Sequence, residues 1–454
     1  MSRSVPGHAS EPLIRVGIIL AQDDRDAVHL RVPAGSYQAY GPGTLPGMAG
    51  EDGHLEVHSA GGMVAVRGAA PDTVILPSLR LSPAGEQPLC PGAGVLIRDV
   101  PAGRGFHWEK AVDQSFPGTV EIVPGERGLL VINAVPLEAY LAGVVTAEMN
   151  AACPGHLLKA QAIAARSWLL AMTEAKHADR PFERCNDDCC QRYQGTTNLT
   201  DAAIAAVAAT RGQVLCGPDD RILDANYAKC CGGITESPVA VWGREKPGLR
   251  PVVDAPGGAP EQRFLPVTEA LMPEYVSGPW LRAAQAFCSP NVVPPAEIGR
   301  YLGRVDQPGD YFRWQVRHTR AELEELLVQH VPAARNLRTL RTLRVSARGV
   351  SGRCSALELE WIDMHGRGVS TRLDSEYQIR RALHRRFLYS SAFMLRPERA
   401  ADGDLTAVVL HGAGWGHGVG MCQIGALGMA LQGFDCETIC RHYYPEAGVR
   451  AAYP

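Results

Sequence analysis

The spacing of the apolar residues changes at Pro136, and this change constrains the fold more than any other feature of the chain. Before it, residues 12–135 alternate short apolar runs with glycine and proline turns, as in IRVGIIL and HSAGGMVAVRG. Apolar residues at every second position are typical of strands. After it, Leu137, Leu141 and Val144 recur at helical spacing, with a proline suited to the first position of a helix. The sequence therefore predicts an α+β fold.

Four segments with different patterns define the expected domain organisation. A strand-rich N-terminal region covers residues 12–130, and residues 131–245 form the first part of a catalytic core with a central helical pair. Residues 246–400 are expected to be an inserted segment with α/β elements, irregular at its start because it is rich in proline and glycine. Residues 401–454 return to the core.

Two helix starts can be placed from local signals. The stretch that begins at His156 repeats small apolar residues at helical spacing and predicts the second member of the helical pair. Thr319 is followed three residues later by Glu322, which is a capping box and predicts a helix start there.

Charge and hydropathy exclude some classes of function. The net charge of -3 does not favour binding to nucleic acid or to anionic lipid. No apolar run approaches the roughly 18 residues of a membrane span. The apolar core VGIIL near the N-terminus is too short for a signal peptide and has charged neighbours. As written, the chain is expected to be cytoplasmic, unless its export signal lies outside this start site.

The cysteines are clustered. There are 13, an odd number, and Cys185, Cys189 and Cys190 lie together, as do Cys230 and Cys231. Adjacent cysteines rarely form a disulfide with each other, because the geometry is unfavourable. Such clusters favour a metal site, although reduced, buried cysteines that act as small apolar residues are the alternative.

Several motifs together resemble the stage II sporulation protein D family (SpoIID/LytB, amidase enhancer). Their order and spacing both match over most of residues 12–447. The motifs are VPLEAYLAGVVTAEMNAACPGHLLKAQAIAARSWLLAM, CNDDCCQRYQG, NYAKCCGGITESPVAVWG and GAGWGHGVGMCQIGALGMALQGFDCETICRHYYPEA.

The resemblance implies a peptidoglycan lytic transglycosylase. Such an enzyme cleaves the bond between N-acetylmuramic acid and N-acetylglucosamine in glycan strands without stem peptides, and leaves 1,6-anhydro ends. The family's catalytic acid lies in a Glu-Met-Pro box, which corresponds to Glu148 here, with Asn150 in place of the proline. The helix that ends at Glu148 also disfavours the ionised carboxylate through its dipole, which suits a general acid.

The resemblance suggests further site residues. His417, in the glycine-rich box of residues 414–421, is expected to face the glycan and to bind sugar hydroxyls or assist proton transfer. Its alternative role is a hydrogen bond that fixes the turn. Expected substrate-binding residues, each with core packing as the alternative, are Lys159, Arg166, Tyr227, Trp415 and Gln423.

A structural zinc ion is the expected cofactor, with no organic cofactor. In many relatives the cysteine loop reads Cys-x-x-x-His-Cys, and here Cys189 replaces the histidine with another good zinc ligand. The predicted ligands are His177, Cys185 and Cys190, completed by Cys189 or Cys231.

Two other functions stay open at this point. One is a non-catalytic glycan-binding protein that enhances a cell-wall amidase. The other is a hydrolase with Cys422 as nucleophile and His417 as base. The family resemblance also implies glycan strands as the partner and the cell envelope as the location, with no membrane span.

Overall fold

The protein is described from a computed structural model. The structure describes residues 10–41, 43–44, 53–68, 72–105, 109–150, 152–171, 176–187, 189–302 and 309–454. The chain divides into two compact units. The first comprises Met1–Val214, Tyr301–Asp306 and Arg450–Pro454, and the second comprises Leu215–Arg300 and Gln307–Val449. The four-part division expected from sequence stays a prediction.

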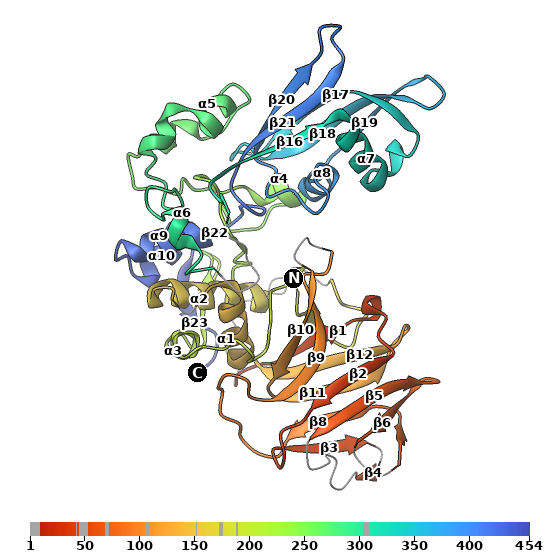
Figure 1. Ribbon diagram of the computed structural model, residues 1–454. Helices are drawn as coiled ribbons and strands as arrows, with labels where there is room; N and C mark the ends of the chain where they lie inside the picture. Colours follow the sequence, from red (N-terminus) through yellow and green to blue (C-terminus); the bar gives the residue numbers. More distant parts are fainter. Residues whose placement is uncertain are drawn as a thin grey trace. The chain divides into compact units, whose positions relative to one another are not determined.

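The first unit contains two large sheets, which are antiparallel except for the parallel pair of β1 and β13 (Figure 1). Strand β1 of one sheet contacts β9 of the other, and β11 contacts β6. The seven-stranded sheet has the order β13-β1-β12-β11-β8-β3-β4, from Arg184–Cys185, Leu13–Ile19, Leu129–Pro136, Thr119–Pro124, Leu79–Pro83, Tyr37–Gly41 and Gly43–Thr44. The six-stranded sheet has the order β10-β9-β2-β5-β6-β7, from Lys110–Phe116, Val95–Ala102, Ala27–Arg31, His54–Ala60, Met63–Arg67 and Val74–Leu76. Strands β2, β5, β6, β8 and β11 bury every second residue over part of their length, as the sequence predicts, whereas β12 is buried on both faces.

Three helices complete the first unit: α1 (Leu137–Glu148), α2 (Gly155–Ala171) and α3 (Asp201–Ala209). They contact one another, and α1 also contacts β1 and β12. Because α1 is surrounded by these elements, every residue of it except Ala139 is buried. The predicted helical pair and the α+β class are therefore confirmed.

The second unit contains two small antiparallel sheets. They have the orders β16-β21-β20 (Arg313–Thr319, Leu405–Ala413, Phe393–Arg399) and β17-β18-β19 (Leu337–Arg348, Cys354–Asp363, Gly368–Leu373). Helix α7 (Arg320–His330) begins at the predicted capping box, in which Thr319 and Glu322 bond to each other's backbone. An apolar core that includes Trp361, Leu327 and Phe393 lies beneath α7 and α8 (Glu376–Ala382).

The start of the predicted insertion is more ordered than its composition suggests. It contains short helices, α5 (Met272–Ser277) and α6 (Pro295–Ile298), and two 3-10 turns, Pro260–Phe264 and Pro279–Ala283. Each begins with a proline in its first turn, where the missing N–H is no loss.

Short elements surround the glycine-rich box. They are α4 (Pro238–Trp242), α9 (Gln423–Leu431), α10 (Cys436–Tyr443) and the parallel pair β15 (Tyr227–Ala228) and β22 (Met421–Cys422). A further two-stranded pair consists of β14 (Gln213–Cys216) and β23 (Gly448–Ala451), and two more 3-10 turns are Ala21–Asp23 and Pro332–Ala334.

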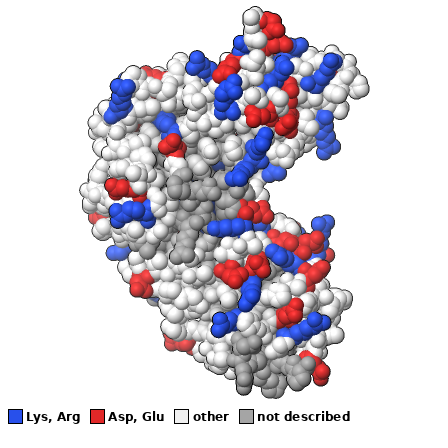
Figure 2. All heavy atoms as spheres, in the orientation of Figure 1, with Lys and Arg blue, Asp and Glu red and all other residues white. Residues whose placement is uncertain are grey.

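Charged side chains of both signs lie on the surface. On the face shown in Figure 2, acidic and basic side chains of the described residues are interspersed. Among the helices of the described residues, none combines the length and the apolar character that crossing a membrane requires.

Candidate functional site

Glu148 is the last residue of α1 and is only 8% exposed. The helix ends there because Met149 adopts an extended conformation, with φ -136° and ψ 146°, while its N–H still bonds to the carbonyl of Val145 at 3.0 Å. Met149 then forms an antiparallel bridge with Leu302. The Glu148 carboxyl group is thus attached to a buried helix, and the residue after it is held by a bond to Val145 and by the bridge to Leu302.

Asn150, the departure from the family box, has a local structural explanation. Its N–H donates to the carbonyl of Tyr301 at 3.0 Å, a bond that proline cannot make. Its side-chain oxygen accepts the N–H of Ala152 at 3.2 Å, which closes a turn. Asn150 therefore connects the segment after Glu148 to Tyr301–Leu302, and the sequence alone does not reveal this partner.

Arg166, a predicted substrate ligand, is fully buried in α2. Its guanidinium donates to both carboxylate oxygens of Glu138, at 3.1 and 2.6 Å, and to the carbonyl of Gln213 at 2.9 Å. Glu138 also accepts bonds from the N–H of Gly212 and the hydroxyl of Tyr453. This network favours a structural role for Arg166, and substrate binding by it stays a prediction.

The other predicted glycan-binding residues differ in their surroundings. Lys159 is half-buried on α2, and Gln423 is buried at the start of α9. The ring of Trp415 stacks on Tyr389, with centroids 4.4 Å apart, and lies 4.6 Å from the ring of Tyr311. These contacts favour packing for Trp415. Tyr227, on β15, is half-buried, and sugar binding by all four residues stays a prediction.

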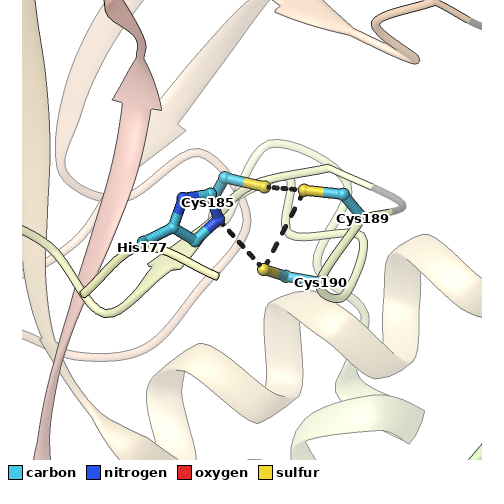
Figure 3. Close-up of side chains that lie close together, drawn as sticks. All are labelled: His177, Cys185, Cys189 and Cys190. Atoms are coloured by element: carbon cyan, nitrogen blue, oxygen red, sulfur yellow. Dashed lines mark hydrogen bonds between the residues drawn. The ribbon is translucent and has the colours of Figure 1, made fainter. Parts of the chain in front are cut away.

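His177, Cys185, Cys189 and Cys190 converge on one point, and we call them the loop group (Figure 3). Their ligand atoms all lie within 4.8 Å of one another. The Nε2 atom of His177 is 3.4 Å from the sulfur of Cys190, and the sulfurs of Cys185 and Cys189 are 2.8 Å apart. One imidazole and three thiols are a ligand set typical of structural zinc, so the residues fit the predicted ion.

The cysteine loop is fixed to the edge of the seven-stranded sheet. Cys185 lies on β13, which pairs with β1, and packs beside Phe182 and Leu20. Asp187 accepts the N–H groups of Gly103 and Arg104 at 3.0 and 2.8 Å. The cysteine loop is therefore held against β1 and residues 103–104 by contacts that do not involve the four side chains of the loop group.

Within the loop group, Cys190 is the thiol that ionises most easily. Hydrogen bonds from Cys185 and Cys189 lower its pKa, whereas the hydrogen bond to Cys189 is the main cause that raises the pKa of Cys185. A thiolate held by neighbouring donors is the form that binds a metal. Cys231, the other candidate for the fourth ligand, is not part of this group and instead lies with Asp254, Cys288 and Cys422.

The glycine-rich box packs its backbone against residues 226–236. Trp415 and Cys230 exchange two backbone hydrogen bonds, at 3.0 and 2.7 Å, and Val419 bridges to Glu236. Gly418 and Gly420 have φ values of 75° and 74°, in the left-handed region. A Cβ at Gly418 would overlap the guanidinium of Arg353, and one at Gly420 would overlap the carbonyl of Asn226. Glycine is therefore required there by conformation and by space.

His417 is held as a neutral imidazole in this box. Burial is the main cause that lowers its pKa to about 3, and the charges of Arg353 and Arg380 add to it. The ring lies against Trp242, with centroids 5.1 Å apart, and Nδ1 accepts the N–H of Val419 at 3.0 Å. Because Nδ1 is an acceptor, we assign the proton of the neutral ring to Nε2.

Glu148 belongs to the first unit and His417 to the second. The expectation that His417 faces the glycan on which Glu148 acts therefore stays a prediction. Asp254 and Cys288 are not predicted as ligands from the sequence. Cysteine is a common metal ligand, but nothing in the spacing of the two residues indicates that they lie close together.

Comparisons with known proteins agree with the resemblance seen in the motifs. Residues 125–216, which include Glu148 and the loop group, match the family profile described as stage II sporulation protein. Residues 241–420 match a domain of unknown function (DUF8618). The helical pair, the glutamate box and the cysteine loop thus lie in the part of the chain that matches this family profile.

Relatives along the chain extend this match. Stage II sporulation protein D of Bacillus amyloliquefaciens is 23% identical over 71% of this chain and 76% of its own length. The protein of the same name from Bacillus subtilis is 23% identical over 69% and 74%. An uncharacterised protein of Brachyspira hyodysenteriae is 24% identical over 72% and 70%. The profile match and these relatives support the assignment of the chain to the stage II sporulation protein D family.

Proposed function

We propose that the protein is a peptidoglycan lytic transglycosylase with Glu148 as its general acid and base. It cleaves the bond between N-acetylmuramic acid and N-acetylglucosamine in strands without stem peptides. The observation that carries the proposal is the family match over residues 125–216, with a glutamate at the end of a buried helix where the family has its catalytic acid. The location that follows is the cell envelope.

The reaction needs a single carboxyl group. Protonated Glu148 gives its proton to the glycosidic oxygen as the bond from that oxygen to C1 of the muramic acid breaks. The C6 hydroxyl of the same sugar then attacks C1, and its proton returns to the Glu148 carboxylate. No water is consumed, and the product is a 1,6-anhydro sugar. Because the nucleophile belongs to the substrate, proximity replaces the second carboxylate of ordinary glycosidases.

In this proposal His417 acts as a hydrogen-bond donor and not as an acid. A pKa of about 3 leaves the ring neutral near pH 7. The Nε2 proton bonds to the backbone of Tyr227 in the structure, so a sugar hydroxyl would replace that acceptor. The bond from Val419 to Nδ1 fixes the orientation of the ring. The account therefore assigns the proton transfers to Glu148 alone.

The loop group is proposed to hold a structural zinc ion. His177, Cys185, Cys189 and Cys190 supply four ligands, which leave no open position for substrate or water. The ion would stabilise the loop beside β13. It takes no part in the bond cleavage.

The experiment compares wild type with Glu148→Gln on glycan strands stripped of stem peptides, with products identified by mass spectrometry. Wild type is expected to release 1,6-anhydro-muramyl products. The variant should be slower by about 10²- to 10⁴-fold, the usual contribution of a general acid or base. Glu126→Gln is the matched control, because the Glu126 side chain is 77% exposed in the same unit and should keep full activity.

Two results would contradict the proposal. Full activity in Glu148→Gln would remove Glu148 from the mechanism. Binding of glycan without cleavage by the wild-type protein would favour the alternative function, an enhancer of a cell-wall amidase.

A further inference from the structure

A second group of potential ligands lies inside the second unit, apart from the loop group. It consists of Cys231, Asp254, Cys288 and Cys422, which we call the buried group. None of the four is more than 3% exposed, and their ligand atoms all lie within 4.8 Å of one another.

The distances within the buried group suit a tetrahedral metal. The sulfurs of Cys231 and Cys288 are 3.7 Å apart, and the sulfur of Cys231 is 3.3 Å from Oδ2 of Asp254. A tetrahedral zinc ion with Zn–S bonds of about 2.3 Å separates two sulfurs by about 3.8 Å, and a sulfur and a carboxylate oxygen by about 3.5 Å. The group therefore needs little rearrangement to enclose an ion.

Backbone N–H groups point at the sulfurs. Cys422 accepts the N–H of Cys231 at 3.1 Å and that of Gly425 at 3.3 Å, and Cys231 accepts the N–H of Gly233 at 3.3 Å. Cys422 also caps the N-terminus of α9, where the helix dipole favours a negative charge. Donors arranged in this way stabilise thiolates that bind a metal.

The carboxylate of Asp254 is completely buried, and each of its two oxygens accepts a hydrogen bond. Oδ1 accepts the hydroxyl of Tyr443 at 2.5 Å, and Oδ2 accepts the backbone N–H of Cys288 at 3.2 Å and lies 3.3 Å from the sulfur of Cys231. Among the described residues, the only ion-pair partner found for Asp254 is His442, at 3.9 Å. A buried carboxylate is costly unless a cation compensates it, and a bound metal ion supplies that charge.

We propose that Cys231, Asp254, Cys288 and Cys422 bind a zinc ion in a closed structural site, separate from the site of the loop group. Three thiolates and one carboxylate fill a tetrahedral shell and match the preferences of zinc. The four ligands come from the CCGG loop, the start of the 245–310 segment, the segment before α6 and the start of α9. The ion therefore holds the segment that follows the glycine-rich box against three distant parts of the same unit.

The site explains two features that the proposed catalysis leaves unused. The 245–310 segment supplies Asp254 and Cys288, which gives it a structural purpose in the unit. Cys422 lies among ligands and backbone donors, which accounts for a buried thiol there without a role as nucleophile. The proposal does not depend on the activity of Glu148.

Native mass spectrometry of the full chain, expressed with zinc in the medium, tests the proposal together with elemental analysis of zinc. Wild type should carry one zinc ion more than Cys288→Ser. Cys354→Ser is the matched control and should keep the wild-type zinc content. Cys354 is a fully buried free thiol of the same unit, and its bond to the carbonyl of Ala356 can also be made by serine.

A second variant decides the result if Cys288→Ser fails to fold. His177→Ala with Cys190→Ser removes the loop group and leaves the buried group intact, so this protein should still carry one zinc ion. If the double variant His177→Ala, Cys190→Ser carried no zinc, the proposal would be overturned. Equal zinc content in wild type and folded Cys288→Ser would do so too, as would a wild-type mass that shows a disulfide in place of an ion.

Discussion

The two units each combine one sequence box of the family motifs with one group of cysteines, but the two cysteine groups are built differently. In the first unit the loop group comes from a single short stretch, residues 177–190, and Cys189 is exposed. In the second unit the buried group joins residues as far apart as Cys231 and Cys422, separated by 191 positions. One group stabilises a loop, and the other connects the parts of a whole unit.

The two units also differ in their buried polar contacts. Beneath the helices of the first unit, Arg166 and Glu138 form a fully hydrogen-bonded ion pair. The second unit also contains buried ion pairs, Lys246 with Asp224 and Arg380 with Glu376, but its buried group connects segments that are more distant in the sequence. We therefore expect the first unit to depend on its ion pair more than on its cysteines, and the second to depend on its buried group.

The largest expected effect on stability is the loss of the Arg166 ion pair. Arg166→Met leaves the Glu138 carboxylate buried without a cation and should lower the free energy of unfolding by about 3–5 kcal/mol. Denaturant titration measures the change. Arg180→Met is the control, because Arg180 is 41% exposed and its ion pair with Glu126 spans 3.5 Å, so that less than about 1 kcal/mol should be lost. Equal effects would mean that the ion pair does not anchor the first unit.

Zinc removal should distinguish the contributions that the two cysteine groups make to stability. Chelation should lower the unfolding free energy of the second unit by about 2.7 kcal/mol relative to protein with free zinc at about 100 times Kd. Cys288→Ser should abolish this dependence, whereas Cys190→Ser should leave it in place. Thermal unfolding with and without chelator measures both. If Cys190→Ser reduced the zinc-dependent stabilisation more than Cys288→Ser does, the loop group would be the more important of the two.

A smaller effect is expected at the turn after Glu148. Asn150→Pro removes the N–H that bonds to Tyr301 and leaves a carbonyl without its donor, which should cost about 1–3 kcal/mol. Asn150→Ala keeps that N–H and loses only the bond to Ala152, so it should cost about 1 kcal/mol. Unfolding measurements on the pair give the ranking. A more stable proline variant would show that the bond to Tyr301 is dispensable.

The last expected effect is a pH dependence from His417. Its pKa is about 3 in the folded protein and 6.5 as an ordinary value, so the unfolded chain binds the proton more readily between these values. The free energy of unfolding should therefore fall as the pH falls through this window, by at most about 1.4 kcal/mol per pH unit from this group. Denaturant titrations across the window should show a flatter dependence for His417→Gln. An unchanged slope would mean that His417 is not held neutral.

Local patterns in the sequence predicted much of the fold and one of the two groups. The change of period at Pro136 identified the strands and the helical pair, and Thr319 with Glu322 identified the start of α7. The loop group lies within a short stretch, and the resemblance to the family's cysteine loop pointed to its residues, with the fourth ligand left open between Cys189 and Cys231. These features depend on neighbours along the chain.

The features that the sequence did not reveal depend on contacts between distant residues. Asp254 and Cys288 lie in a segment whose composition predicts irregular structure, and only the fold places them beside Cys231. The ion pair of Arg166 with Glu138 spans two helices. The bond from Asn150 to Tyr301 links positions about which periodicity carries no information.

Oxygen-18 water offers the most direct test of the central claim, that Glu148 drives an attack by the substrate's own hydroxyl. Denuded glycan strands would be digested in this solvent, and the new ends analysed by mass spectrometry. The account predicts unlabelled anhydro ends from wild type and none from Glu148→Gln. Labelled reducing ends would show that water is the nucleophile and would contradict the lytic transglycosylase mechanism.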